Sequence, residues 1–129
     1  PEGRQPIYHT NVLMCMTDRY AVICLDTIDD VNERTMVVDA LEKSGRFIIE
    51  ITEEQKHQFA GNMLLVKGAE EALYLVMSSS AHAALTAEQV SEIEQYHTIL
   101  HSDLTTIETL GGGSARCMLA EIYLPKQAH

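Results

Sequence analysis

Positive charge is scarce in this chain. Only 9 of its 129 residues are lysine or arginine, against 19 aspartates and glutamates, and the formal net charge is −10. The few cations are dispersed along the chain and form no basic cluster, which argues against binding to nucleic acid or to an anionic membrane. No apolar run reaches the length of a membrane span, so we expect neither a transmembrane helix nor a signal peptide.

Cysteine is also sparse, and its spacing is uninformative about metals. Cys15, Cys24 and Cys117 are odd in number and include no C-x-x-C pair. This usage fits a reducing, cytoplasmic compartment better than a disulfide scaffold or a zinc site. Cys15 and Cys24 lie within apolar stretches, where a cysteine behaves as a small core residue. We therefore predict a cytoplasmic protein with no metal or other cofactor.

What is present indicates one α/β domain. Apolar residues make up 46% and charged residues 22% of the chain, as in ordinary globular proteins. Apolar and β-branched runs predict strands at positions 7–16, 20–28, 47–51, 62–67, 72–77, 96–100 and 116–124. Capping residues and apolar periodicity predict helices at positions 30–43, 52–58 and 104–110 and one that starts at Thr86.

The order of these elements suggests an internal repeat. Two strand-strand-helix-strand (ββαβ) modules are followed by a partial third, and hairpins recur where a doubly wound sheet would have crossovers. Modules of this kind need neighbours to cover them, so we expect the chain to be part of a longer array. Unpaired strand edges recruit partners, and we also predict an oligomer or an association with the rest of the array.

The most informative motif is the run Gly-Gly-Gly-Ser-Ala-Arg-Cys at positions 111–117. Three glycines let a loop pass close to a ligand and set Cys117 at the mouth of the last predicted strand, a suitable place for a nucleophile. The same pattern also fits a tight turn that leads to a small buried cysteine. The local pattern does not choose between these two interpretations.

A non-catalytic function is the competing class. A glycine loop can cradle an anion with its backbone N–H groups, and Arg116 can contact a carboxylate or phosphate. However, phosphate-binding loops open a helix and end in Gly-Lys-Ser/Thr, whereas this loop precedes a β-rich run. An α/β binding module is therefore the weaker alternative.

Most of the histidines carry no clear signal. His97 and His101 have a spacing that suits a metal, but no carboxylate or cysteine is placed to complete the site. We therefore predict that both are surface residues. His57 and His82 are also expected to be exposed to solvent.

Three segments together resemble the guanidine-modifying enzyme superfamily. They are Tyr8-His9-Thr10-Asn11-Val12, Gly61-Asn62-Met63-Leu64 and Gly111 to Met118. The superfamily comprises arginine deiminases, amidinotransferases and dimethylargininases, and the chain is most similar to the amidinotransferase-related branch that includes citrulline-utilising hydrolases. The resemblance implies a pentein-like α/β propeller of five ββαβ blades around a central active site. Residues 1–129 would then be the C-terminal part of one catalytic domain, about two to three blades.

The resemblance also implies the chemistry. Cys117 would attack the central carbon of a guanidino or ureido group, and His9 would be the general acid and base. Histidine suits that role because its pKa of about 6.5 lets it donate and accept protons near neutrality. Gly113 and Arg116, beside the nucleophile, are predicted to contact substrate. The implied activity is hydrolysis of a C–N bond in a small guanidino or ureido amino acid, with an amidinotransferase as the alternative.

Asn11 departs from the pattern of the superfamily. Arginine deiminases and amidinotransferases usually have an acidic residue two positions after the histidine. An amide cannot neutralise a guanidinium, but it donates to and accepts from a neutral ureido group. Asn11 therefore favours a substrate such as citrulline over arginine, unless it only satisfies backbone groups at the end of a strand. The acidic residues with which the superfamily binds substrate have no match here, which leaves the activity of this chain alone open.

Overall fold

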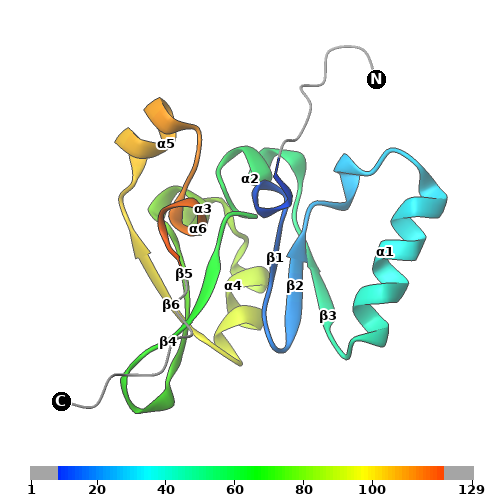
Figure 1. Ribbon diagram of the computed structural model, residues 1–129, viewed down its shortest axis with the longest axis horizontal. Coiled ribbons are helices and arrows are strands. Elements are labelled where there is room, and N and C mark those ends of the chain that lie inside the picture. Colours follow the sequence, from blue (N-terminus) through cyan, green and yellow to red (C-terminus); the bar gives the residue numbers. More distant parts are fainter. Residues whose placement is uncertain (1–8, 121–129) are drawn as a thin grey trace.

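The computed structural model describes residues 9–120, and its strands form two three-stranded sheets (Figure 1). The first sheet contains β1 (Met14–Met16), β2 (Tyr20–Ile23) and β3 (Phe47–Glu50). The second contains β4 (Leu64–Lys67), β5 (Leu73–Ser78) and β6 (Thr98–Ser102). In each sheet the first two strands are antiparallel and the third is parallel to the second. We call residues 14–50 the first module and residues 64–102 the second module.

Helices complete both modules and connect them. The crossover from β2 to β3 is α1 (Val31–Lys43), and the crossover from β5 to β6 contains α3 (Ser79–Ala84) and α4 (Ala87–Glu94). The predicted repeat of ββαβ modules in an α/β fold is thus confirmed. The other helical segments are η1 (Thr10–Val12), η2 (Leu25–Thr27), α2 (Glu53–His57), η3 (Ala69–Glu71), α5 (Thr105–Gly111) and α6 (Ala115–Met118).

Side-chain caps start the helices where the sequence predicts them. The Asp30 carboxylate accepts the N–H groups of Asn32 and Glu33 at 2.7 and 3.1 Å and caps α1. Thr52 and Thr86 each form a capping box with the glutamine three positions later. These caps satisfy N–H groups that have no partner within the helix.

Two predicted strands differ from the structure near the ends of the chain. The strand predicted at 116–124 is wrong over its first part, where residues 115–118 form α6, and positions 121–124 lie outside the described residues. The strand predicted at 7–16 has the 3-10 turn η1 before its short extended part, β1. The apolar content of both segments suits a strand, but contacts with residues distant in the sequence determine their backbone conformation. The helix α3 was not predicted, because its alanines and serines have no apolar periodicity.

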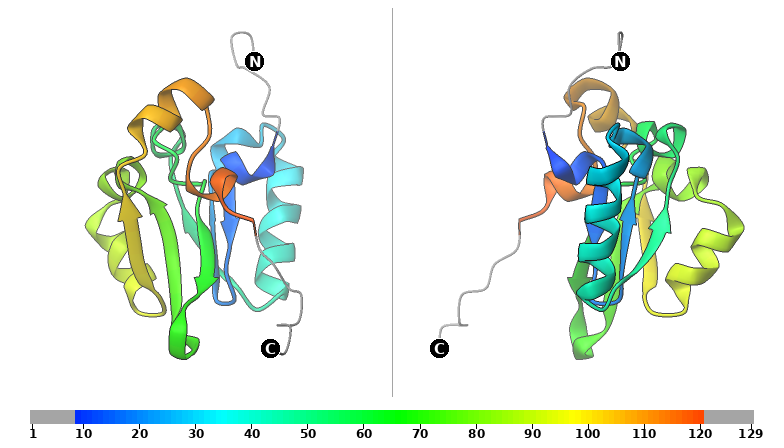
Figure 2. Two further views of the ribbon diagram at one scale, coloured as in Figure 1. Left: turned by 60° about the vertical axis from the view of Figure 1, so that its left-hand side comes forward. Right: turned by 90° about the vertical axis from the view of Figure 1, so that its right-hand side faces the viewer.

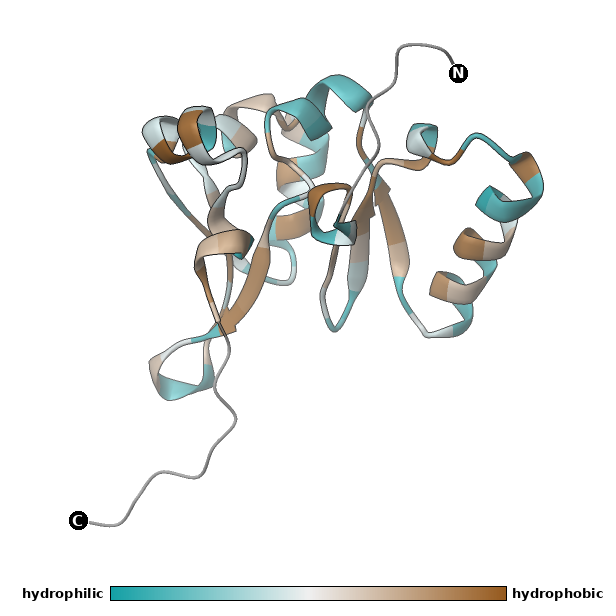
Figure 3. Ribbon diagram, turned by 45° about the horizontal axis from the view of Figure 1, so that its top comes forward, coloured by the Kyte–Doolittle hydropathy of each residue, from teal (hydrophilic) through white to brown (hydrophobic). Residues whose placement is uncertain are grey.

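The core lies on both faces of β2. Ala21 and Ile23 point to one face and pack with Leu41 of α1. Tyr20 and Val22 point to the opposite face and pack in a cluster with residues of the second module: Leu75, Met77, Ala81, Leu85 and Ile93. Hydrophobic residues are concentrated on the strands, and the turns between them are hydrophilic (Figure 3). Cys15 and Cys24 belong to this second cluster, so their predicted place in the core is confirmed.

The prediction that His97 is a surface residue is wrong. His97 is buried, with Nδ1 2.8 Å from the hydroxyl of Tyr20 and Nε2 2.8 Å from the carboxylate of Asp18. A carboxylate only accepts, so Nε2 donates to Asp18, and a neutral imidazole then accepts the Tyr20 O–H. The partners of His97 lie more than 70 positions away in the first module, which is why no local pattern identifies it. His101 is exposed, as expected. Its ring stacks on that of His82, with the two ring centroids 4.2 Å apart. His82 is half-buried, although the sequence predicts it to be exposed.

Within the described residues, no helix is long and apolar enough to cross a membrane. The helix α1 lies on the outer side of the first module, and α4 lies on the opposite side of the molecule (Figure 2). The segments η1 and α6 are far apart in the sequence, yet they lie next to each other in both views of Figure 2. This junction contains the residues that the sequence singled out.

Candidate active site

Cys117 lies in α6, which packs against β5, and it is exposed. The glycine run brings the backbone directly against this thiol. A Cβ at Gly113 would be 3.0 Å from the Cβ and 3.2 Å from the Sγ of Cys117. Any larger residue at Gly113 would therefore crowd the sulfur, while the predicted contact of Gly113 with substrate stays a prediction.

The buried carboxylate of Glu108 binds the serine that follows the glycine run. The Ser114 hydroxyl donates to a carboxylate oxygen of Glu108 at 2.6 Å, and both residues are buried. This hydrogen bond joins the last turn of α5 to the start of α6. The short loop at Gly112 and Gly113, between α5 and α6, is therefore held at both ends.

Asn62 is the residue that contacts Cys117 most directly. Its side chain is fully buried, and Oδ1 accepts the N–H groups of Arg116 and Cys117 at 3.0 and 3.4 Å. Its Nδ2 donates to Sγ of Cys117 at 3.0 Å. Asn62 belongs to the motif Gly61-Asn62-Met63-Leu64, but the sequence predicts no role for it. Its partners lie 54 and 55 positions away, and only the fold brings them together.

Gly61 connects this thiol to the N-terminal segment. A Cβ at Gly61 would be 2.7 Å from the carbonyl oxygen of Val12 and 2.8 Å from the carbonyl carbon of Leu13. No residue with a side chain fits there without a shift of the backbone. The pair Gly61-Asn62 therefore lies between η1 on one side and Cys117 on the other.

His9 and Asn11 are at η1. His9 is exposed and directly precedes η1, with its carbonyl accepting the N–H of Val12 at 3.2 Å. The fold brings the segment of His9 beside that of Cys117, but no hydrogen bond joins their side chains in the described structure. Asn11 is half-buried, and its Oδ1 is buried and has no hydrogen-bond partner among residues 9–120.

The three cysteines differ in burial, and burial raises the pKa of two of them. Burial raises the pKa of the Cys15 thiol to about 12, and the positive charge of Arg116 partly offsets this rise. Burial also raises the pKa of Cys24. Both thiols are thus neutral and enclosed at physiological pH, whereas Cys117 is exposed. Arg116 is half-buried, and its predicted contact with substrate stays a prediction.

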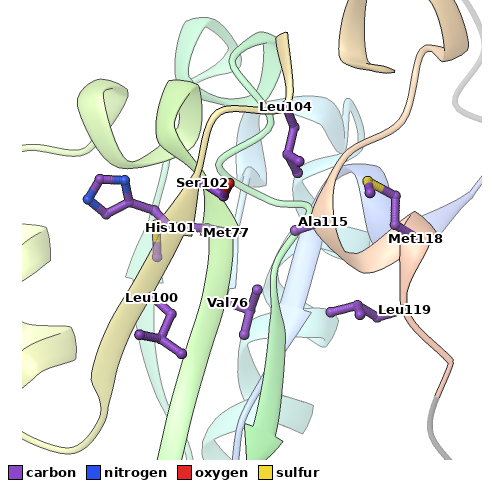
Figure 4. Close-up of a pocket in the computed structure, with 9 residues that line it drawn as sticks. All are labelled: Val76, Met77, Leu100, His101, Ser102, Leu104, Ala115, Met118 and Leu119. Atoms are coloured by element: carbon purple, nitrogen blue, oxygen red, sulfur yellow. The ribbon is translucent and has the colours of Figure 1, made fainter. Parts of the chain in front are cut away.

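No group of three or more histidine, cysteine or acidic side chains is placed to hold a metal ion in the part of the chain that the structure describes. A pocket of about 260 Å³ lies between β5, β6 and α6, and Figure 4 shows its residues. The lining is mainly apolar and consists of Val76, Met77, Leu100, His101, Ser102, Leu104, Ala115, Met118 and Leu119. Cys117 does not line this pocket.

A family model described as "N,N dimethylarginine dimethylhydrolase, eukaryotic" matches residues 2–124, nearly the whole chain. The chain belongs to this family. Membership of the dimethylarginine dimethylhydrolase family confirms the resemblance to the guanidine-modifying superfamily, of which the dimethylargininases are one branch. No curated protein sequence matches the chain.

A solved structure supports the fold of this dimethylarginine dimethylhydrolase family member. It is the apo structure of ArgZ, described as an arginine dihydrolase from the ornithine-ammonia cycle in cyanobacteria. The two are 18% identical with a TM-score of 0.63, and the match covers 86% of this chain and 15% of the ArgZ chain. The chain thus has the fold of one part of a much longer protein.

Proposed function

We propose that the protein containing this chain hydrolyses a C–N bond of a small guanidino or ureido amino acid, with Cys117 as nucleophile and His9 as general acid and base. The observation that carries the proposal is the position of Cys117. It is the exposed thiol, it lies against a glycine loop, and a buried amide donates to it. The helical turn that follows His9 lies next to α6 in Figure 2. Family membership provides the class of reaction.

The reaction with a guanidino substrate proceeds in two stages. The Cys117 thiolate forms a bond to the central carbon, and the electron pair of the C=N bond moves to nitrogen. The departing nitrogen takes a proton from the His9 imidazolium and leaves as an amine or ammonia, which gives a thiouronium bound to the enzyme. His9 then removes a proton from water, and the resulting hydroxide adds to the carbon. The hydroxyl group loses its proton to solvent as the C–S bond breaks, which releases a ureido product and the thiolate.

The geometry of α6 counts against the anion-binding alternative. A loop that cradles an anion needs free backbone N–H groups at the start of its helix. In this chain the N–H groups of Arg116 and Cys117 both point to Oδ1 of Asn62. These donors are therefore already used inside the protein.

Asn11 supports a choice of substrate. Its Oδ1 is a buried acceptor without a partner, and such an atom gains free energy when a donor reaches it. An N–H group of a ureido or guanidino substrate is such a donor. N,N-dimethylarginine is the first compound to test because of the family, and citrulline is preferred to arginine because Asn11 carries no negative charge.

The test is turnover and labelling of the full-length protein. We expect Cys117→Ala to lower turnover about 10³-fold or more, while Cys24→Ala, a matched change of a buried thiol, keeps wild-type turnover within a few-fold. A chloroacetamidine-type reagent is expected to add once, at Cys117, and a substrate is expected to block it. Full turnover by Cys117→Ala would overturn the proposal. Protection by arginine but not by citrulline would overturn the preference assigned to Asn11.

A further inference from the structure

The amide of Asn62 is oriented by its surroundings. Oδ1 faces two backbone N–H groups, those of Arg116 and Cys117, and these groups can only donate. The oxygen must therefore be on that side, and the NH₂ group is on the side of the Cys117 sulfur. The Nδ2–Sγ distance of 3.0 Å thus represents a donor directed at sulfur.

The backbone around Asn62 is held in place on both sides. The Asn62 N–H donates to the carbonyl of Phe59 at 2.9 Å, in a tight turn between α2 and β4. Phe59 has a φ of +66°, a left-handed conformation that a bulky side chain adopts only where its surroundings impose it. On the other side, Gly61 packs against the backbone of Val12 and Leu13. The segment that carries Asn62 has little freedom to move.

Full burial makes the donor more effective. The side chain of Asn62 has no exposed surface, so water does not compete for its N–H. A hydrogen bond to an ionised acceptor in such a place is stronger than one to a neutral acceptor. The donor therefore favours the thiolate of Cys117 over the thiol.

We propose that Asn62 positions Cys117 for attack and stabilises its thiolate through the N–H that it donates to sulfur. The inference rests on the proposed role of Cys117 as nucleophile. Asn62 combines two tasks in one side chain: its oxygen fixes the first turn of α6, and its nitrogen acts on the reacting sulfur.

One substitution separates these tasks. Asn62→Asp keeps the two acceptor bonds from Arg116 and Cys117 but removes the donor to sulfur. We expect the rate of alkylation of Cys117 by iodoacetamide, followed by intact mass on the full-length protein, to fall about 10- to 100-fold at pH 8. We also expect kcat to fall by a similar factor with little change in KM, because the donor acts on the enzyme's sulfur rather than on substrate.

The matched control is Gln55→Glu. Gln55 is a buried amide whose Nε2 donates to the carbonyl of Ala84 and to Gln89, away from the thiol. This change also turns a buried amide into an acid, and we expect it to leave the alkylation rate within about twofold. If Asn62→Asp fails to fold by circular dichroism, Asn62→Ala is measured in its place and must show the same slower alkylation.

Alkylation of Asn62→Asp at the wild-type rate would overturn the inference, as would an equal decrease in Gln55→Glu. The readout also separates the inference from the proposed function. If Cys117→Ala retains turnover, the proposed function fails, while the effect of Asn62 on the reactivity of sulfur is still measured. If Cys117→Ala is inactive and Asn62→Asp is normal, the inference alone fails.

Discussion

The two modules have the same strand order, but they differ in what covers the equivalent face of their central strands. Tyr20 and Val22 hold the same positions in the pairing of β2 with β3 as Tyr74 and Val76 hold in the pairing of β5 with β6. Tyr20 and Val22 are fully buried by the second module, whereas Tyr74 and Val76 are only half-buried. The open face continues onto Leu100 of β6, which is 47% exposed.

This difference follows from how the modules stack, because one face of the first sheet packs against the second module. Each module covers one face of its sheet with its own crossover, α1 in the first and α3 with α4 in the second. The other face of the first module is covered by the module that follows it in the sequence. Among the described residues, α6 contacts β5 on that side of the second module, next to the apolar pocket shown in Figure 4. Repeat proteins depend on neighbours in this way, and their terminal units show it most clearly.

The largest expected effect comes from a charge placed on each of the two equivalent faces. Val22→Asp buries an unpaired carboxylate between the modules, which costs several kcal/mol and is expected to unfold the 129-residue chain. Val76→Asp leaves the carboxylate near solvent and is expected to cost about 1 kcal/mol. Urea denaturation followed by circular dichroism measures both. Equal losses of stability would contradict the comparison for this chain. In the full-length protein, a larger cost for Val76→Asp would indicate that another segment covers this face.

A smaller effect is expected from the polar contact between the modules. His97→Phe leaves the buried hydroxyl of Tyr20 without its partner, and we expect a loss of about 1–3 kcal/mol in the free energy of unfolding. His101→Phe, at an exposed position of the same sheet, is the control and should change it by less than about 0.5 kcal/mol. Adding Tyr20→Phe to His97→Phe removes the unpaired hydroxyl and should recover part of the loss. No recovery would mean that the hydrogen bond contributes little.

The smallest effect concerns alkaline pH. Burial raises the pKa of Cys15 from 9.0 to about 12, so above pH 9 the unfolded chain loses this proton while the folded chain keeps it. Unfolding then releases a proton, and the free energy of unfolding falls as pH rises. Stability from this group is complete below pH 9. Between pH 8 and 9.5 we expect Cys15 to account for a decrease of about 1 kcal/mol.

The variant Cys15→Ala tests this assignment. Urea midpoints at pH 8 and 9.5 should differ less in the variant than in the wild type. Cys24 and Tyr20, whose pKa values burial also raises, contribute to the decrease that is left. An identical pH dependence in the two proteins would exclude Cys15 as a source.

Local patterns were sufficient to predict most of the fold. The caps at Asp30, Thr52 and Thr86 are hydrogen bonds between near neighbours in the sequence, so the sequence shows them directly. Runs of apolar and β-branched residues likewise locate β2, β3, β4 and β5. The α6 segment is different, because its apolar residues suit a strand while Oδ1 of Asn62 binds two of its N–H groups and holds them in a helical turn.

The candidate site was predictable only in part. The glycine run singles out Cys117 and Gly113, which lie close together, and their roles toward substrate stay predictions. Asn62 and His97 were not assigned their contacts, because each binds residues more than 50 positions away. A buried polar residue needs partners, but the sequence does not reveal which residues these are.

The link between Asn62 and Cys117 also has a consequence for the order of folding. The two residues are separated by 55 positions, and contacts of long sequence separation form only after a large loss of chain entropy. The α2–β4 turn must therefore be complete before the sulfur acquires its donor. Until the native topology has formed, Cys117 therefore lacks the hydrogen bond that Asn62 donates to its sulfur.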